Sequence, residues 1–284
     1  MTTTPSPQEH GPAARRWADA LAAWALPEEI LAQAPEPPYG FDVGLFARIA
    51  DDAVTRYTPS RRVALEALPV GGSVLDVGCG GGAASLPLVP PASLLVGVDE
   101  SPDMLAAFAE RAAAQGAGHL LVEGRWPEVA DRAPPVDVVV CHNVLYNAPD
   151  AGPFLRALND HARQRVVVEL TEEHPVSWMN PYWQHLHGLH RPDGPTASDA
   201  AEVARELGYD VAVERWERPW RDHDEEHLVA MVRRRLCVGP ERDPEIRTLL
   251  DRFPPPGARE VATLWWSPST AVEWAGVGTA SSSG

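Results

Sequence analysis

From residue 73 onward the sequence alternates short apolar runs with segments of helical periodicity, and this alternation constrains the fold more than any other feature. Five runs are short and almost continuously apolar, as strands buried on both faces are. They lie at 73–78, 94–99, 119–124, 136–143 and 165–170. Because alternating strands and helices form parallel sheets covered on both faces, we predict an α/β fold with a Rossmann-like, doubly wound, mostly parallel sheet.

Two further strands, at 209–216 and 261–267, bring the predicted sheet to seven. Helical spacing of apolar residues over 222–236 and 243–253 places a helical insertion at about 218–256, before the last strand. A short helix is expected after the first strand, and others at 102–115, 154–162 and 198–207, the last with Ser198 as its cap. The segment 171–197 is rich in Pro, His and Trp and is expected to be irregular.

The sequence before residue 73 shows helical periodicity only. Helices are expected at 15–34, 41–57 and 60–68, with Ser60 capping the third. Thr, Pro and Ser dominate the first residues, and small polar residues dominate the last ten. We therefore predict a disordered N-terminus (1–14), an N-terminal helical cap (15–70), a main domain (71–274) and a flexible tail (275–284).

Composition narrows the partners and the location that we expect. With 40 acidic and 24 basic residues the formal net charge is −16, so phosphate backbones are repelled and no nucleic-acid partner is expected. The single run of three basic residues, 233–235, would fan around a helix. No apolar stretch suits a membrane span or a signal peptide, which predicts a cytoplasmic protein without membrane contact. Three cysteines provide no disulfide framework.

The run VLDVGCGGG at 74–82 is the strongest functional signal. It leaves the first strand and is expected to open a helix. Glycines at 78, 80 and 82 allow a sharp turn and a close approach of the backbone to a ligand. Asp76, two residues before the first glycine, can accept hydrogen bonds from an ammonium group. A tight strand-to-helix turn without a ligand is the alternative.

A second acidic signal ends the second strand. Asp99, in GVDES, stands 21 residues after Gly78. A carboxylate at this position suits the two hydroxyl groups of a ribose. Together, the glycine run and this carboxylate predict a nucleoside-containing ligand.

The motifs DVGCGGG and GVDESPDML resemble those of class I S-adenosylmethionine-dependent methyltransferases. As a fold pattern the resemblance covers about 73–216. It implies that Asp76 lies near the amino group of S-adenosylmethionine, that Asp99 binds the ribose and that Met104 lies against the adenine. The cofactor-binding residues that it implies are Asp76, Gly78, Cys79, Gly80, Asp99, Glu100, Met104, Arg125, Trp126, Asn143 and Val144.

One position departs from the pattern of this family. After the third strand the family often has an acidic residue that contacts the adenine amino group, whereas this chain has Arg125. An arginine only donates hydrogen bonds and cannot accept one from that group. Trp126 could stack on adenine instead, or could simply pack in the core.

Methyl transfer from a sulfonium needs an aligned and dry site more than a fixed catalytic motif. If the acceptor is a hydroxyl group, a general base helps, and His142, Tyr146 and His174 are the candidates. The predicted function is methyl transfer to a small-molecule acceptor. We expect the N-terminal helices and the 218–256 insertion to form a lid that orders when the cofactor binds.

Histidines crowd the segment from 174 to 190, in the order His174, His185, His187 and His190. Three interpretations are open: a metal site, a general base, or a packed lid segment. No carboxylate is spaced to complete a known zinc motif, so no metal is expected. The aromatic residues Trp178, Tyr182 and Trp183 either line an acceptor pocket or attach this segment to the domain.

Two other functions fit the sequence less well. A non-catalytic protein that binds the same cofactor would explain Arg125. A dinucleotide-dependent oxidoreductase would need the spacing G-x-G-x-x-G, and residue 83 is alanine. The oligomeric state and the acceptor are not encoded in any motif that we identify.

Overall fold

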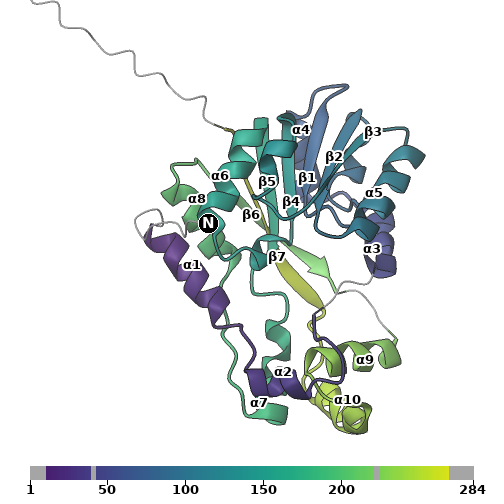
Figure 1. The fold of residues 1–284 in the computed structure, drawn as a ribbon, viewed down its shortest axis with the longest axis vertical. Coiled ribbons are helices and arrows are strands. Elements are labelled where there is room, and N and C mark those ends of the chain that lie inside the picture. The colour runs from purple at the N-terminus through teal and green to yellow at the C-terminus, as the bar shows by residue number, and fades with distance from the viewer. Residues whose placement is uncertain (1–10, 40–42, 221–223, 269–284) are drawn as a thin grey trace, which may run out of the picture.

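The computed structural model describes residues 11–39, 43–220 and 224–268. Seven strands form one sheet in the order β3-β2-β1-β4-β5-β7-β6, and β7 runs antiparallel to both of its neighbours. The predicted seven-stranded, mostly parallel α/β sheet is confirmed (Figure 1). The strands are β1 Ser73–Val77, β2 Leu94–Asp99, β3 Gly118–Glu123, β4 Val136–His142, β5 Ala162–Thr171, β6 Ala212–Pro219 and β7 Ala258–Trp266.

Helices cover both faces of the sheet, and each face has its own apolar core. On one face, α1, α6 and α8 contribute to one apolar core with the sheet. On the other face, α3, α4 and α5 do so. These helices are α1 Pro12–Ala22, α3 Val43–Thr55, α4 Pro59–Ala67, α5 Pro102–Ala114, α6 Ala151–His161 and α8 Ala197–Glu206. Burial of both faces explains why the central strands are almost continuously apolar.

The N-terminal region differs from its prediction in two ways. The single helix expected at 15–34 is two helices, α1 and α2 Glu28–Gln33, because Pro27 lacks the N–H that a continuous helix would need. In addition, α1 begins at Pro12, and Ala13 and Ala14 are buried rather than disordered. Residues 1–10 of the predicted N-terminal tail, and the whole predicted tail at 275–284, lie outside the described residues.

The connection between β1 and β2 also differs from the prediction of a short α-helix. It consists of turns and a short 3-10 helix, Leu86–Leu88. Prolines at 87, 90 and 91 lack N–H donors, so a regular helix could not form here. The glycine run therefore leads into a tight, irregular turn.

Four helices form a separate apolar cluster below the sheet, which we call the helical lobe (Figure 1). It consists of α2, α7 Asn180–His187, α9 Glu225–Arg235 and α10 Asp243–Arg252. The insertion predicted before the last strand is confirmed in α9 and α10. The segment expected to be irregular is partly helical, because it contains α7.

Helix caps differ in detail from the predictions. Thr196, not Ser198, caps α8 through a capping box with Asp199. Thr58, not Ser60, caps α4, and this frees the hydroxyl group of Ser60 for another contact. Among the described helices, none combines the length and the apolar character that crossing a bilayer requires.

Candidate active site

The glycine run at the end of β1 has backbone conformations that residues with a side chain rarely adopt. Gly78, Gly80 and Gly82 have φ angles of +69°, +49° and +93°. A Cβ atom on Gly78 would also lie 2.3 Å from Cγ2 of Val144, which follows β4. Both its φ angle and its contact therefore require glycine at position 78.

Helix α3 of the N-terminal cap lies directly on this glycine loop. A Cβ atom on Gly80 would lie 3.2 Å from Cδ1 of Phe46, and one on Gly81 would lie 2.8 Å from the Phe46 carbonyl oxygen. The glycines thus also serve close packing against α3. Helix α3 thus contacts the loop, whereas a lid formed by all the N-terminal helices and the 218–256 insertion, and its ordering by a cofactor, remain predictions.

Asp99, at the end of β2, ties the glycine loop to helix α5. Its Oδ2 accepts a hydrogen bond from the Gly80 N–H at 2.9 Å, and its Oδ1 accepts one from the Ser101 N–H at 3.0 Å. Ser101 caps α5, and the buried Met104 lies in the first turn of that helix. A carboxylate has further lone pairs, so Asp99 can still accept bonds from hydroxyl groups.

Asp76 is the buried acidic group beneath the glycine loop. Its carboxyl group is 1% exposed and accepts a hydrogen bond from the Ser85 hydroxyl at 2.6 Å. Burial, with the nearby Asp99 as a smaller cause, raises the pKa of Asp76 to about 7, although the Ser85 hydrogen bond opposes the shift. A cationic ligand group close to Asp76 would favour the ionised form.

The other predicted contacts of the adenosyl group fall into two sets. Glu100 and Arg125 form an ion pair, 3.6 Å from Oε1 to Nε, and Arg125 also donates to the Asn147 carbonyl oxygen at 3.4 Å. By contrast, Cys79 and Trp126 are buried. The indole N–H of Trp126 donates to the Phe154 carbonyl oxygen at 3.3 Å, so its position favours core packing over stacking on adenine.

The end of β4 brings a further predicted pair to the glycine loop. Asn143 has a φ angle of +59°, and its N–H donates to the Glu169 carbonyl oxygen at 2.7 Å. This turn directs Val144 against Gly78. Asn143 itself is exposed at the carboxyl edge of the sheet, where a ligand would pass.

His142, the last residue of β4, lies beside a buried carboxylate. Its Nδ1 is 3.8 Å from Oε2 of Glu169, its register partner on β5, and its Nε2 is buried without a hydrogen-bond partner among the described residues. Burial, with Arg218 as a further cause, lowers the pKa of His142. A neutral ring with its hydrogen on Nδ1 would leave Nε2 as a proton acceptor.

Glu169 is held ionised by a polar network that sequence analysis did not identify. Burial opposes its ionisation, but the charge that His142 carries when protonated, the charge of Arg218 and the hydrogen bonds from Ser60 and Arg218 lower its pKa. The Ser60 hydroxyl lies 2.7 Å from Oε2, and Nη1 of Arg218 lies 2.9 Å from Oε1. A carboxylate that only accepts hydrogen bonds is thereby satisfied on both oxygens.

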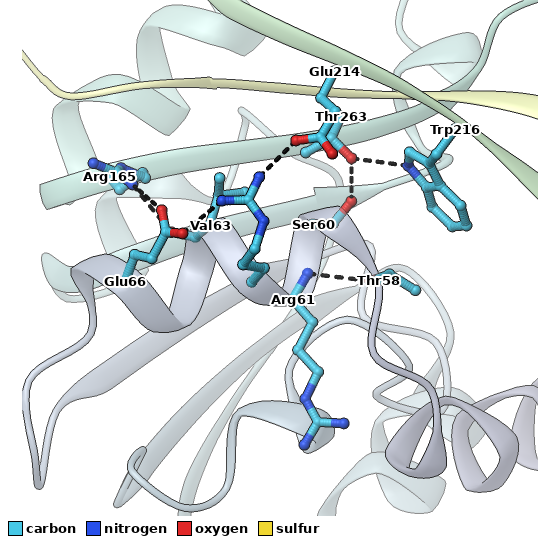
Figure 2. A network of polar contacts seen from close by, with 10 residues as sticks. Thr58, Ser60, Arg61, Val63, Glu66, Arg165, Glu214, Trp216 and Thr263 are labelled. Atoms are coloured by element: carbon cyan, nitrogen blue, oxygen red, sulfur yellow. Dashed lines mark hydrogen bonds and ion pairs between the residues drawn. The ribbon is translucent and has the colours of Figure 1, made fainter.

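The network continues across the sheet through hydroxyl groups (Figure 2). The indole of Trp216 donates to Oγ1 of Thr263 at 3.1 Å, and Thr263 lies 2.7 Å from the Ser60 hydroxyl. Because indole only donates and carboxylate only accepts, the bonds run from Trp216 through Thr263 and Ser60 to Glu169. A single glutamate inside the apolar run RVVVEL was the signal that could have revealed this network.

The other two candidate bases lie in different surroundings. Tyr146 is buried, its hydroxyl donates to the Thr171 carbonyl oxygen at 2.6 Å, and burial raises its pKa, so it stays protonated. His174 stacks on Trp24 at 3.8 Å between ring centroids, and burial lowers its pKa to about 4. Tyr146 also stacks on Trp17 of α1, in the core of the sheet face opposite α3 and α4.

The histidines of the 174–190 segment do not come together around a metal. His185 contacts Glu245, and His187 bonds to the Leu236 carbonyl oxygen. Within the described residues, no group of three or more His, Cys, Asp or Glu side chains is arranged to hold a metal ion. Tyr182 and Trp183 are buried in the helical lobe, which favours the packing interpretation for both.

Comparison with known proteins agrees with this geometry. Residues 75–168, from β1 to β5, match the family model described as a methyltransferase domain. This stretch contains the glycine loop, Asp99 and His142. The chain therefore contains a methyltransferase domain.

Two relatives of this methyltransferase are ubiquinone biosynthesis O-methyltransferases. The one from Azorhizobium caulinodans is 36% identical over 83 residues, which are 29% of this chain and only 33% of that protein. The one from Caulobacter vibrioides is 26% identical over 211 residues, covering 64% of this chain and 80% of that protein. Among solved structures, magnesium protoporphyrin IX methyltransferase from Synechocystis PCC 6803, with bound SAH, has a TM-score of 0.50 at 18% identity, covering 90% and 97% of the two chains.

The residues of this methyltransferase fit the cofactor of the family. Asp76 is a buried carboxyl group, and a cationic group such as the amino group of S-adenosylmethionine would favour its ionised form. The two oxygens of Asp99 face the glycine loop and the start of α5. Arg125 stands at the position where the family often has an acidic residue.

Proposed function

We propose that this chain transfers a methyl group from S-adenosylmethionine to a hydroxyl group of a small-molecule acceptor, with His142 as the general base. The observation that supports this proposal is the position of His142. Its Nε2, which has no hydrogen-bond partner in the described part of the chain, lies at the carboxyl end of β4, and the chain turns from there to place Val144 against the glycine loop. Both curated relatives are named O-methyltransferases.

The proposed cofactor site uses the glycine loop, Asp76 and Asp99. When bound, S-adenosylmethionine supplies a sulfonium methyl group that an acceptor oxygen displaces, so that a C–O bond forms and the C–S electron pair stays on sulfur. Asp76 would bind the amino group and Asp99 the ribose hydroxyls. Helix α3, packed on Gly80 and Gly81, would exclude water from this side of the site.

His142 would remove the proton that the hydroxyl group loses. Its lowered pKa keeps the ring neutral near pH 7 and therefore able to accept a proton. Once His142 is protonated, the adjacent carboxylate of Glu169 stabilises the imidazolium. Arg218 and Ser60 keep that carboxylate ionised and fixed in place.

Two measurements test this function. Isothermal titration calorimetry with S-adenosylhomocysteine should show binding, and the Asp76→Asn and Asp99→Asn variants should weaken it. Incubation with methyl-labelled S-adenosylmethionine and a panel of small phenols should place the label on oxygen. Absence of S-adenosylhomocysteine binding, or a label found only on nitrogen or carbon, would overturn the proposal.

A non-catalytic cofactor-binding protein is the second candidate, favoured by one observation. The Arg125 side chain bridges Glu100 and the Asn147 carbonyl oxygen at the predicted adenosyl end of the site. Binding of S-adenosylhomocysteine without turnover of any phenol in the panel would favour this candidate.

A further inference from the structure

A cavity lies where the helical lobe meets the carboxyl edge of the sheet. Its volume is about 200 Å³, and its lining includes Trp178, Trp220, Met231, Arg235 and Arg259. Arg259 is the second residue of β7, and Arg235 ends α9. The cavity is therefore formed by the insertion before the last strand and by the 175–179 segment, and shares no residue with the glycine loop.

Two arginines of this cavity have no acidic partner among the described residues. The guanidinium of Arg259 stacks on the Trp220 ring at 4.1 Å, and the charge of Arg218, another cation, adds to burial in lowering the pKa of Arg259. Arg235 has Arg234 and Tyr39 as its charged or titratable neighbours. Burial lowers the pKa of both arginines, that of Arg259 to about 10.

A half-buried cation without an anionic partner lowers the stability of the folded protein. Acidic side chains that could neutralise such a cation are abundant in this chain. It has 40 acidic residues against 24 basic ones. Arg247 and Arg233 of the same lobe do pair with carboxylates, Arg233 with Asp243 and Arg247 with glutamates of α9. Since buried charges are normally paired, two arginines that line one cavity and have no carboxylate partner among the described residues indicate a site for an anionic ligand.

The remaining lining of the cavity suits an aromatic ring. Trp178 and Trp220 pack edge to face, with 5.3 Å between centroids, and Met231 adds a thioether. Such surfaces bind flat apolar groups. Because an apolar cavity of about 150 Å³ already holds benzene, about 200 Å³ is enough for a single-ring compound.

The cavity and His142 belong to the same face and the same edge of the sheet. Arg259 is the ladder partner of Arg218, and Arg218 bonds to Glu169 beside His142. Arg259 lies two strands and four residues from the register position of His142, which corresponds to about 17 Å between Cα atoms. Two extended side chains and one substituted ring can span such a distance.

We propose that this cavity binds the acceptor, and that Arg235 and Arg259 recognise a carboxylate on it, so that the substrate is a small hydroxylated aromatic acid. This inference rests on the proposed function and adds the substrate class. The carboxylate would lie between the two guanidinium groups. The ring would lie against Trp178 and Trp220, and its hydroxyl group would point toward His142.

Calorimetry with two isosteric probes tests this proposal. The probes are 3,4-dihydroxybenzoate and its neutral amide, 3,4-dihydroxybenzamide, each titrated into the full chain with S-adenosylhomocysteine present. The acid should bind about tenfold more tightly than the amide, because hydrogen bonds to charged groups are stronger. Arg259→Gln and Arg235→Gln should remove that preference and leave amide binding within twofold. Inorganic phosphate, which lacks a ring, should bind more weakly than the acid.

Arg247→Gln is the matched control, because Arg247 belongs to the helical lobe but does not line the cavity. It should keep the tenfold preference for the acid. Equal binding of acid and amide by the wild-type chain, unchanged preference in both arginine variants, or no binding of the acid by a protein that binds S-adenosylhomocysteine would each overturn the proposal. Absence of S-adenosylhomocysteine binding would instead be the failure of the proposed function. The comparison of acid with amide in the wild-type chain does not depend on the folding of any variant.

Discussion

The two halves of the carboxyl edge of the sheet are built in different ways. On the side of β1 and β2, the candidate site comes from one continuous stretch, residues 76–99, and has backbone turns and two carboxylates. On the side of β5, β6 and β7, it comes from side chains far apart in sequence, such as Ser60, Glu169 and Arg259. The first half is local, whereas the second exists only after folding.

This difference separates two tasks. A cofactor shared by a whole family can be held by a fixed loop, in which glycine conformation leaves little freedom. An acceptor that differs between relatives needs side chains that can be exchanged without disturbing the loop. We therefore expect changes in the β5–β7 half to alter turnover or acceptor affinity and to leave cofactor affinity almost unchanged.

The largest effect that would sharpen this contrast is expected for His142→Ala. Loss of a general base typically lowers kcat by about 10² to 10⁴-fold. Affinity for S-adenosylhomocysteine should stay within twofold, because His142 faces Glu169 rather than Asp76 or Asp99. Steady-state kinetics of phenol methylation measures kcat, and calorimetry measures the affinity for S-adenosylhomocysteine. His185→Ala, an exposed histidine of α7, is the control and should retain turnover.

A substitution in the loop should have the opposite pattern. Gly78→Ala forces a side chain into a positive φ angle and against Val144, so we expect stability to fall by about 2–4 kcal/mol and cofactor binding to weaken. Gly116→Ala is the matched control, because Gly116 has a φ angle of +76° with no atom within 4 Å of an added Cβ. Chemical denaturation measures the loss of stability in both variants. Equal losses for the two variants would show that contact with Val144 is unimportant.

Removal of one hydroxyl group from the β5–β7 half should have an intermediate effect. Ser60→Ala leaves Thr263 without its acceptor and takes one bond from Glu169, which should cost about 1–3 kcal/mol of stability. Cofactor affinity should not change. The control Ser93→Ala removes an exposed hydroxyl and should cost less than about 0.5 kcal/mol. A loss as small as that of the control would mean that the network contributes little to stability.

The smallest expected effect concerns pH and the β1–β2 half. The pKa of Asp76 is about 7 in the ligand-free protein, so below that pH the carboxyl group must lose a proton before it can pair with an ammonium group. Affinity for S-adenosylhomocysteine should therefore fall by up to about tenfold per pH unit below pH 7 and level off above it. Asp76→Asn should bind weakly with little dependence on pH. A pH-independent wild-type affinity would contradict the pairing.

The β1–β2 half could be predicted from sequence more fully than the β5–β7 half. The strand alternation and the glycine run depend on neighbouring residues, so the sheet, the loop, Asp76 and Asp99 were predicted. Ser60 was expected to cap α4, because nothing in the sequence shows that it faces Glu169 across the core. Arg259 and Trp220 were not identified, because only the pairing of β6 with β7 brings them to one cavity. Trp126 and His174 were ambiguous in sequence, and burial decided how they are placed.

The direction of β7 has one consequence for how such an enzyme could change its chemistry. Because β7 is antiparallel to β5 and β6, the chain leaves β6 and re-enters β7 at the same edge of the sheet. The connection formed by residues 220–257 therefore begins and ends at neighbouring positions on two adjacent strands. Such a segment can be swapped as a unit between homologues, so laboratory chimeras exchanged at these two junctions should transplant substrate preference while the remaining fold is retained.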